Sequence, residues 1–340
     1  MGESLALADE PPHIGVQGLT DELVTFYREH ELDRGEVGKE ALDWTFKGAD
    51  DAFCVMRRGS EIVGLSAYIR LPFKFGEEMG SALQAVDSYV SSSMRGQGVF
   101  TQLARTYSSR AQEQDVDLIW GFPNANAAPA WFGKLGWTNF GQVPFLIRPL
   151  RAGYFLRRFK LPGDFRLTLA RDRGLAALTR AESWIDDLWD GYSETIGCAG
   201  VRDRAAIEHR LFNGPHAASY RIVGDPQAGR DGGALVATRE AAKHGGRIAY
   251  LMEAMGGSGL GEMLQSELAR LRDRGTELVL AWSFPWSPNY RALRQCGFLP
   301  FPKALRPIEI WFGAKSYSRR GTAAADLRNW YLSYLDSDTI

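Results

Sequence analysis

The sequence predicts an α/β fold in which one order of strands and helices is run through twice. Residues 82–90 have the alternation and β-branched content of a strand, and they lead through a Gly-rich loop into an amphipathic helix at 101–112. The same order of strand, Gly loop and helix recurs at 247–272. A length of 340 residues, of which 45% are hydrophobic, suits two domains of ordinary size.

Local signals place the elements of the first half. Thr20 and Asp21 are candidate N-caps for a first helix, and a hairpin turns at Arg58-Gly59. The expected order is a helix at 19–30, a hairpin at 52–69, a bend at 76–80, the strand at 82–90, the helix at 101–112, a short strand at 117–120 and a helix that ends at Gly136.

The second half repeats this order and adds a tail. We expect a strand at 165–170, helices at 181–192 and 202–211, strands at 220–223, 234–238 and 247–255, a helix at 262–272, a strand at 278–282 and a helix at 289–296. In the tail, 326–335, the aromatic residues Trp330, Tyr331 and Tyr334 recur at helical spacing. This spacing predicts a last helix that docks through its aromatic side chains.

The loop before the first long amphipathic helix has the chemistry of a phosphate cradle. Gly96 and Gly98 let the backbone approach phosphate oxygens, and free N–H groups at a helix start bind negative charge. Arg95 adds a charged, forked donor. We therefore expect a pyrophosphate site at 95–100.

This segment resembles the acyl-CoA motif of the GNAT acyltransferase superfamily, whose pattern is Arg/Gln-x-x-Gly-x-Gly/Ala. Arg95 and Gly98 match it, whereas Phe100 stands where the last small residue belongs. The resemblance implies tandem GNAT-like domains, each with a mixed, mostly antiparallel twisted sheet flanked by helices. It also implies an N-acyltransferase that uses acetyl-CoA or another acyl-CoA as cofactor.

The resemblance assigns particular residues to that cofactor. Val90 matches the position whose N–H holds the thioester carbonyl, and a backbone donor there stabilises the developing oxyanion. Phe132 is a departure, because some members of the family carry at this place a Tyr that protonates the leaving thiolate. The expected cofactor-binding residues are Ser88, Tyr89, Val90, Arg95, Gly96, Gln97, Gly98, Val99, Phe100, Asn124, Asn126 and Phe132.

The second copy carries its own Gly loop and closing segment. Gly259 corresponds to Gly98 and Gly297 to Gly136 at one offset, and the pattern Trp-x-Phe-Pro occurs in both halves. The repeat predicts two GNAT-like units in tandem.

The two units differ at the loop. We divide the chain into an N-terminal domain at 1–155 and a C-terminal domain at 156–340. The second loop has Gly256 at the position that Arg95 holds in the first. Without that positive charge, the second loop attracts a phosphate group less strongly. The N-terminal domain is therefore the expected cofactor site.

Two carboxylates are candidates for the base that deprotonates the amine. Asp87 lies on the strand before the first loop, three residues from Val90, and Glu253 has a comparable place in the second half among apolar neighbours. Such neighbours tend to raise the pKa of a carboxyl group. Each residue also has a structural interpretation: Asp87 as a strand residue bonded to a nearby turn, and Glu253 as a paired core residue.

Charge and composition exclude several other classes. A net charge of -1 argues against a general nucleic-acid binder, and neither a membrane span nor a signal peptide is recognisable. The three cysteines and five histidines show no disulfide framework or metal spacing, so we expect no metal. These features predict a cytoplasmic monomer or homodimer, without nucleic-acid or membrane partners.

Two kinds of function remain open. The first is an acyl-CoA-dependent N-acyltransferase, with acetyl-CoA as the expected donor, acting on a small-molecule amine such as an amino sugar or a specialised-metabolite intermediate. The second is a carrier- or tRNA-dependent aminoacyl or acyl transferase of tandem GNAT type, or a CoA-binding protein without catalysis. Arg95 and Gly98 favour the first, and the absence of a Tyr at Phe132 keeps the second open.

Overall fold

The computed structural model describes residues 11–32, 38–46, 48–168, 170–228, 233–243, 245–302, 306 and 309–337. The chain forms two compact units, each made from two separate stretches. Unit 1 contains Met1–Gln142 and Glu309–Leu327, and unit 2 contains Val143–Ile308 and Arg328–Ile340. The join that the sequence suggested near residue 155 lies inside unit 2.

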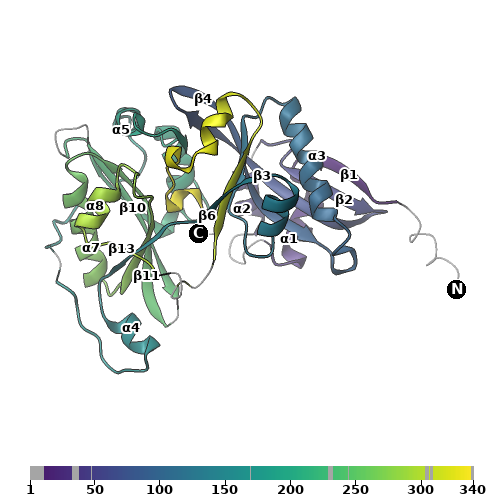
Figure 1. Cartoon of the computed structure of the whole chain (residues 1–340). Helices are drawn as coiled ribbons and strands as arrows, with labels where there is room; N and C mark the ends of the chain where they lie inside the picture. Colours follow the sequence, from purple (N-terminus) through teal and green to yellow (C-terminus); the bar gives the residue numbers. More distant parts are fainter. Residues whose placement is uncertain are drawn as a thin grey trace. The chain divides into compact units, whose positions relative to one another are not determined.

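Unit 1 is built on one mixed sheet (Figure 1). Its helices and strands are β1 (His13–Gln17), α1 (Asp21–Glu29), α2 (Gly38–Thr45), β2 (Phe53–Arg58), β3 (Glu61–Phe75), β4 (Glu78–Val90), α3 (Val99–Glu113), β5 (Leu118–Gly121), β6 (Thr138–Gln142) and β14 (Trp311–Ser316). The strands lie in the order β1-β2-β3-β4-β5-β14-β6. Along this order only β4 and β5 are parallel neighbours.

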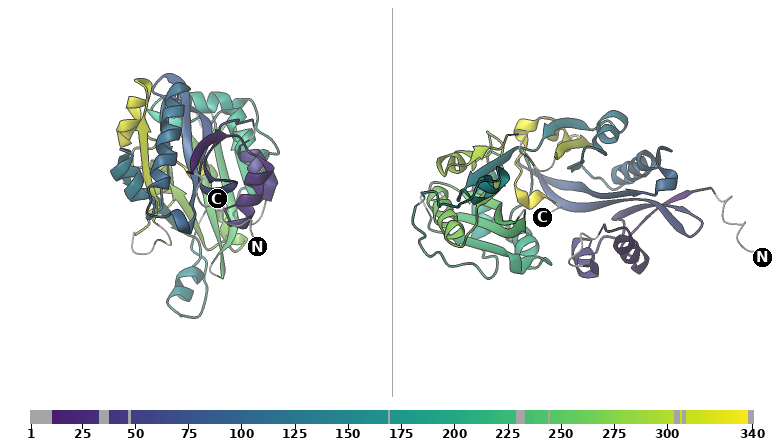
Figure 2. Two further views of the ribbon diagram at one scale, coloured as in Figure 1. Left: turned by 90° about the vertical axis from the view of Figure 1, so that its right-hand side faces the viewer. Right: turned by 90° about the horizontal axis from the view of Figure 1, so that it is seen from below.

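The two faces of this sheet carry separate cores. Helices α1 and α2 cover one face and α3 covers the other (Figure 2). The predicted N-cap of α1 is confirmed, because Thr20 Oγ1 accepts the N–H of Leu23 at 3.2 Å. Tyr27 of α1 is buried in one core, and Leu103 and Tyr107 of α3 are buried in the other.

Unit 2 has a second mixed sheet. Its helices and strands are β7 (Phe145–Pro149), α4 (Gly153–Arg158), α5 (Trp184–Ser193), β8 (Cys198–Gly200), α6 (Arg204–Ile207), β9 (Tyr220–Asp225), β10 (Ala234–Lys243), β11 (Gly246–Gly256), α7 (Leu260–Asp273), β12 (Leu278–Trp282), α8 (Tyr290–Gln295) and β13 (Leu299–Pro300). The sheet order is β13-β7-β12-β11-β10-β9, and only β11 and β12 are parallel.

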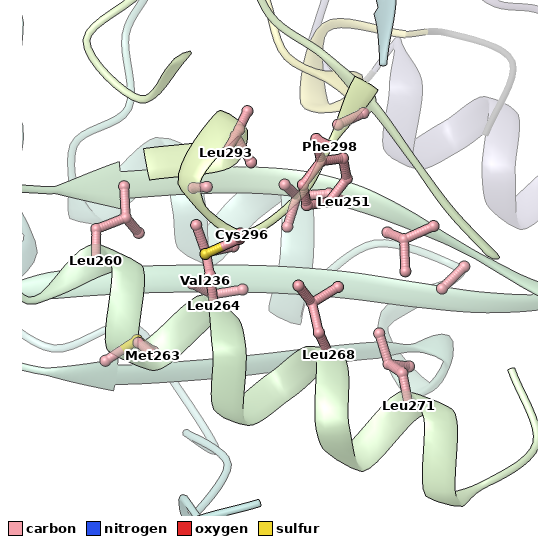
Figure 3. Close-up of a cluster of buried hydrophobic side chains, with 14 of the residues drawn as sticks. Val236, Leu251, Leu260, Met263, Leu264, Leu268, Leu271, Leu293, Cys296 and Phe298 are labelled. Carbon is pink, nitrogen blue, oxygen red and sulfur yellow. The ribbon is translucent and has the colours of Figure 1, made fainter. Parts of the chain in front are cut away.

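Helix α7 shows why the second amphipathic segment is helical. Leu260, Leu264, Leu268 and Leu271 recur every three or four residues, and all four are buried against the sheet (Figure 3). Val236 of β10 lies in the same cluster. The apolar face that the sequence predicted is therefore the face that packs on the strands.

Each sheet is completed by a strand that lies far from its neighbours in the sequence. In unit 1, β14 lies between β5 and β6, and Ala314 pairs with both Trp120 and Thr138. In unit 2, β7 has the corresponding place between β12 and β13. The internal repeat did not reveal this exchange, because equivalent strands have similar sequence signals wherever they pair.

The predicted fold class is confirmed. Both sheets are mixed and mostly antiparallel, and helices flank them. The two sheets are also consistent with the predicted tandem units, because in each of them the single parallel pair encloses a Gly loop and its helix.

Two element predictions are wrong. Within 165–170, the described residues form one isolated bridge, between Arg151 and Arg166, and no strand. The tail has no α-helix; its short helical turns are 3₁₀, at Leu327–Asn329 and Tyr334–Asp336. Between these turns the chain is extended and pairs with Cys198, so its aromatic residues are buried one by one rather than along a helix face.

Candidate functional site

The sheet of unit 1 opens between β4 and β5. The two strands pair from Ala82 with Leu118 to Ala85 with Gly121, where β5 ends. Strand β4 continues to Val90. Beyond Ala85, its backbone extends past the end of the β5 pairing, so its N–H and C=O groups on that side can bind a ligand.

A β-bulge lies in β4 where this opening begins. Tyr68 of β3 pairs with Ala85, but Ser66 pairs with Ser88, so β4 holds one more residue than its partner. A bulge of this kind bends the strand and redirects its side chains.

The backbone beyond the bulge is oriented towards the opening. The N–H of Ser91 donates to the carbonyl of Val63 in β3 at 3.0 Å. In an antiparallel ladder, the backbone groups of successive residues point to opposite sides. The N–H of Val90 therefore points away from β3 and towards the space where β5 has ended.

A cavity of about 70 Å³ occupies the opening, and we call it the slot. Residues of β3, β4 and the segment after β5 line it; among them are Ser66, Tyr68, Asp87, Ser88, Trp131 and Trp137. The two indole rings lie 4.1 Å apart between their centroids, and both residues are buried.

Ser66 is an unsatisfied polar residue of the slot. It is 2% exposed, and its Oγ has no hydrogen-bond partner among the described residues. Burial raises the pKa of the neighbouring Tyr68 phenol, and its interaction with the Ser66 hydroxyl opposes that rise. A buried unpaired hydroxyl costs about 1–3 kcal/mol, so a ligand atom that bonds to it is favoured.

The Gly loop presents an open helix start next to the slot. Gly96 and Gly98 have φ of 79° and 80°, which favours glycine, and nothing lies within 4 Å of a Cβ placed on either. Arg95 is exposed and donates through Nε to the carbonyl of Val90 at 3.2 Å. The first turn of α3 contains no acidic residue, so its N–H groups and dipole remain favourable for an anion.

Asp87 lies on β4 at the slot and is held by α1. It is half-buried, and Tyr27 donates its hydroxyl hydrogen to Oδ2 at 3.2 Å. Tyr27 itself is fully buried. The contact fixes the carboxylate from the α1 side of the sheet.

Of the other predicted cofactor residues, some lie at the slot and some do not; Tyr89, for example, packs against Phe26 and His30 of the α1 segment. Ser88 and Asn124 line the slot, and the Oδ1 of Asn124 accepts the N–H groups of Asn126 and Ala127, each at 3.0 Å. Phe132 does not lie among the lining residues; it packs on Trp311, with 6.3 Å between ring centroids.

Phe100 also makes a contact within unit 1. Its ring meets Trp131 edge-to-face at 5.2 Å, next to the slot. A large apolar residue can replace the small residue of the motif here because the indole of Trp131 accommodates it.

Sequence reasoning did not identify several residues of the slot. Ser66 and Tyr68 are two apart on β3, and this alternation could have placed them on one face. Trp131 and Trp137 belong to the segment around Gly136, where the family pattern singles out Phe132 instead. No local signal joins Tyr27 to Asp87, which is 60 residues away.

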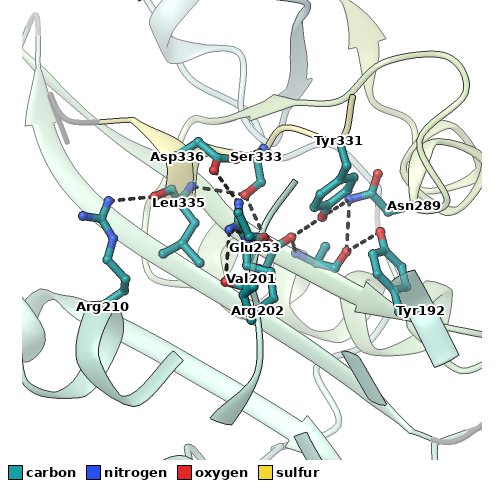
Figure 4. Close-up of polar contacts among 12 residues, drawn as sticks. Tyr192, Val201, Arg202, Arg210, Glu253, Asn289, Tyr331, Ser333, Leu335 and Asp336 are labelled. Carbon is teal, nitrogen blue, oxygen red and sulfur yellow. Dashed lines mark hydrogen bonds and ion pairs between the residues drawn. The ribbon is translucent and has the colours of Figure 1, made fainter. Parts of the chain in front are cut away.

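The equivalent opening in unit 2 has a different interior. Glu253 is fully buried and accepts hydrogen bonds from Arg202 Nε at 2.9 Å, Ser333 Oγ at 2.8 Å and the hydroxyl of Tyr331 (Figure 4). Arg202 also pairs with Asp336 at 2.6 Å. Burial alone would lower the pKa of Arg202, but the two carboxylates raise it overall.

Side chains of unit 2 also bind the backbone that follows the bulge of β11. The N–H of Ala254 donates to Glu253 Oε1 at 2.8 Å, and its carbonyl accepts from Asn289 Nδ2 at 3.0 Å. These contacts favour the structural interpretation of Glu253, as a paired core residue. They also fill the place that an amide-bearing ligand would take.

The Gly loop of unit 2 is less suited to an anion. Gly259 has an ordinary helical φ of -80°, and Glu262 stands in the first turn of α7. The negative charge of a carboxylate at a helix start offsets the positive potential that would otherwise attract a phosphate. Glu262 is paired with Arg173 at 2.7 Å, so part of that charge is neutralised.

Comparison with solved structures identifies the fold. A GCN5-related N-acetyltransferase from Anabaena variabilis ATCC 29413 has a TM-score of 0.62 and 12% identity, over 90% of this chain and 73% of that one. One from Kribbella flavida has a TM-score of 0.60 and 15% identity, over 92% and 73%. N-myristoyltransferase from Saccharomyces cerevisiae, solved with myristoyl-CoA, has a TM-score of 0.57 and 12% identity, over 91% and 85%.

These likenesses show that the chain has the fold of GCN5-related N-acetyltransferases, which the sequence motif had indicated. No protein-family model and no curated protein sequence matches the chain. In the part of the chain that the structure describes, no three His, Cys, Asp or Glu side chains are grouped to hold a metal ion. No described helix combines the length and apolarity needed to cross a membrane.

Proposed function

We propose that the protein is an acyl-CoA-dependent N-acyltransferase that uses acetyl-CoA and acts on a small-molecule amine such as an amino sugar or a specialised-metabolite intermediate. The observation that carries this proposal is the opening between β4 and β5 beside an unobstructed Gly loop in unit 1. Together they offer a phosphate cradle at one end and free backbone donors at the other.

The phosphate end rests on the loop and on α3. The N–H groups at the start of α3 supply partial positive charge, and the guanidinium of Arg95 supplies a full one. The pantetheine arm would then run along the exposed edge of β4, with its amides bonded to the backbone beyond Ala85.

The reacting end rests on Val90 and Asp87. The N–H of Val90 would donate to the thioester oxygen and stabilise the charge that develops there. The amine attacks the carbonyl carbon, the C–S bond breaks, the amine proton passes to Asp87 directly or through a water, and the thiolate takes a proton from solvent. Tyr27 holds Asp87 in place during this transfer.

The proposal places the cofactor in unit 1. In unit 2 the corresponding backbone is bonded to Glu253 and Asn289, and the helix start carries Glu262. Unit 2 would serve as a structural copy.

Calorimetric titration with CoA tests the cofactor directly. Arg95→Ala removes a charge-assisted bond worth about 1.5–3 kcal/mol, so the Kd for CoA should rise by roughly one to two orders of magnitude. Arg58→Ala is a suitable control, because Arg58 contacts Met94 near the loop but lies outside the cradle. An unchanged Kd in Arg95→Ala would contradict the assignment to this loop.

Turnover is a separate measurement. Acetyl-CoA incubated with a panel of amino sugars and other small amines should release free CoA and give N-acetylated products detectable by mass spectrometry. If CoA binds but no amine or acyl donor in a broad panel reacts, the alternative of a CoA-binding protein without catalysis is favoured.

A further inference from the structure

Residues 151–166 of unit 2, which we call the α4 loop, leave the sheet of that unit after β7 and return to the same place. The N–H of Leu167 donates to the carbonyl of Leu150 at 3.0 Å, and the N–H of Ala152 donates to the carbonyl of Phe165 at 3.0 Å. Figure 1 shows α4 standing away from the sheet. The chain between these two bonds is therefore a closed loop on the surface of unit 2.

Ion pairs fix the base of the α4 loop. Arg151 Nε donates to Asp164 Oδ2 at 2.7 Å, and Asp164 Oδ1 accepts the N–H of Gly153 at 3.0 Å. Arg157 donates to the buried Glu277 at 2.7 Å. The shape of the loop is therefore set before a partner binds, which lowers the entropy cost of binding.

The outer part of the α4 loop exposes large apolar side chains. Phe159 is 67% exposed, Leu161 54% and Phe165 60%. Between the first two, Lys160 has a φ of 57°, and the N–H of Leu161 donates to the carbonyl of Leu156 at 2.8 Å, so α4 ends in a left-handed turn. Single exposed apolar residues are ordinary, but several gathered in one short loop indicate an interaction site.

Positive charge accompanies these apolar side chains. Lys160 is exposed and pairs with no carboxylate in the part of the chain that the structure describes. Arg166 reaches Asp273 at 3.5 Å, but both side chains of that pair remain exposed. Over its whole length the loop has one acidic residue, Asp164, against five basic residues: Arg151, Arg157, Arg158, Lys160 and Arg166.

This combination matches the surface of an anionic lipid bilayer. Apolar side chains enter the boundary between headgroups and acyl chains, and basic side chains are attracted to negative headgroups. We propose that the α4 loop docks the protein on such a bilayer, with Phe159 and Leu161 inserted and Lys160 at the headgroups.

This docking goes beyond the proposed acyl transfer and does not depend on it. The lack of a recognisable span, from which the sequence predicts no membrane partner, does not exclude the docking, because a surface loop requires no span.

Cosedimentation of the full chain with lipid vesicles tests this docking. Wild type should bind vesicles of equal parts phosphatidylcholine and phosphatidylserine, should bind phosphatidylcholine vesicles at least about tenfold more weakly, and should be released from the anionic vesicles by salt. The double variant Phe159→Ser, Leu161→Ser should lower the partition coefficient on anionic vesicles at least about tenfold. Lys160→Gln should lower it about fivefold.

Two exposed residues of unit 2 outside the loop provide matched controls. Leu299→Ser removes an exposed leucine of β13, and Lys243→Gln removes an exposed lysine at the end of β10. Both should bind vesicles as wild type does, and circular dichroism should show every variant folded. If wild type does not bind anionic vesicles, or the loop variants bind them equally well, the proposal is overturned. Loop-dependent binding of transfer RNA without binding of vesicles would overturn it as well, in favour of a nucleic acid.

Discussion

The side chain of Asp87 is positioned by a tyrosine from another element, and this contact has a consequence for catalysis. Asp87→Asn keeps the shape and removes the base, so the rate constant for transfer should fall about 10²- to 10⁴-fold with CoA binding retained. Tyr27→Phe should have a smaller effect, because it frees the carboxylate without removing it. Steady-state kinetics over a pH range provide the measurement. Near-normal turnover in Asp87→Asn would exclude it as the base.

Glu253, unlike Asp87, is expected to contribute to stability rather than to the rate of transfer. It is fully buried and bonded to Arg202, Tyr331 and Ser333. Arg202→Met would leave Glu253 and Asp336 as buried charges without their partner, which costs about 3–5 kcal/mol of the free energy of unfolding. Urea denaturation should show this loss. Arg204→Met, at an exposed pair nearby, should cost no more than about 1 kcal/mol.

Buried thiols make stability depend on alkaline pH. Burial raises the pKa of Cys54 and Cys198 to about 12 and that of Cys296 to about 11, against about 8.5 for a free thiol. Below about pH 8.5 the thiols are protonated in both states, so their contribution is complete. As the pH rises towards 11–12, the unfolded chain releases protons that the folded chain retains, and stability falls.

Denaturation at pH 8, 9 and 10 measures this effect. Each thiol contributes at most about 1.4 kcal/mol per pH unit, so Cys54→Ala should have a shallower pH dependence than wild type. Identical slopes would contradict the expectation.

At the residue scale, the sequence predicted the backbone of the Gly loop but not the residues that line the slot. The positive φ angles of Gly96 and Gly98 depend on the local backbone, so a short sequence motif is enough to predict them. Ser66 and Trp131 reach the slot through strand pairing and packing, which depend on residues far away in the sequence.

At the scale of elements, the start of α3 differs from that of α7 in one conformational respect. Gly98 has a φ of 80°, whereas Gly259, at the corresponding place, has a φ of -80°. Gly98→Ala should cost about 1–2 kcal/mol in stability and weaken CoA binding, because a Cβ is disfavoured at that φ. Gly259→Ala is the matched control and should be nearly neutral. Thermal unfolding and calorimetry of both variants measure the difference.

Periodicity correctly predicted the helices that bury a continuous apolar face. It failed in the tail, where the aromatic residues do not lie on one helix face. Helices α1, α3 and α7 were found because their apolar residues recur at helical spacing. The tail has the same spacing of aromatic residues without a helix, since the Ser333 side chain caps a short turn and Trp330 pairs with an extended segment. Spacing alone cannot distinguish these two ways of burying aromatic rings.

At the scale of the whole molecule, two similar units are expected to bind one cofactor. The backbone of β11 is bonded internally by Glu253 and Asn289, while β4 remains open at the slot. Titration with CoA should give a stoichiometry of one per chain. Two equivalent sites would contradict the closed interior of unit 2.

The sequence repeat predicted the number of units but not how the chain is shared between them. Strands β7 and β14 carry signals that suit either sheet, and only the pairing shows which one each completes. Local composition does not show which strands pair when they are far apart in the sequence.

The position of β14 also has a consequence for how the protein is made. Trp120 in β5 pairs with Ala314, so on the ribosome the edge of β5 remains uncovered until β14 has been synthesised and has emerged. At about 5–20 residues per second, this interval lasts roughly 10–40 s. Throughout it, an apolar strand edge is available to other nascent chains, so the yield of active protein should depend on chaperones and on the speed of translation.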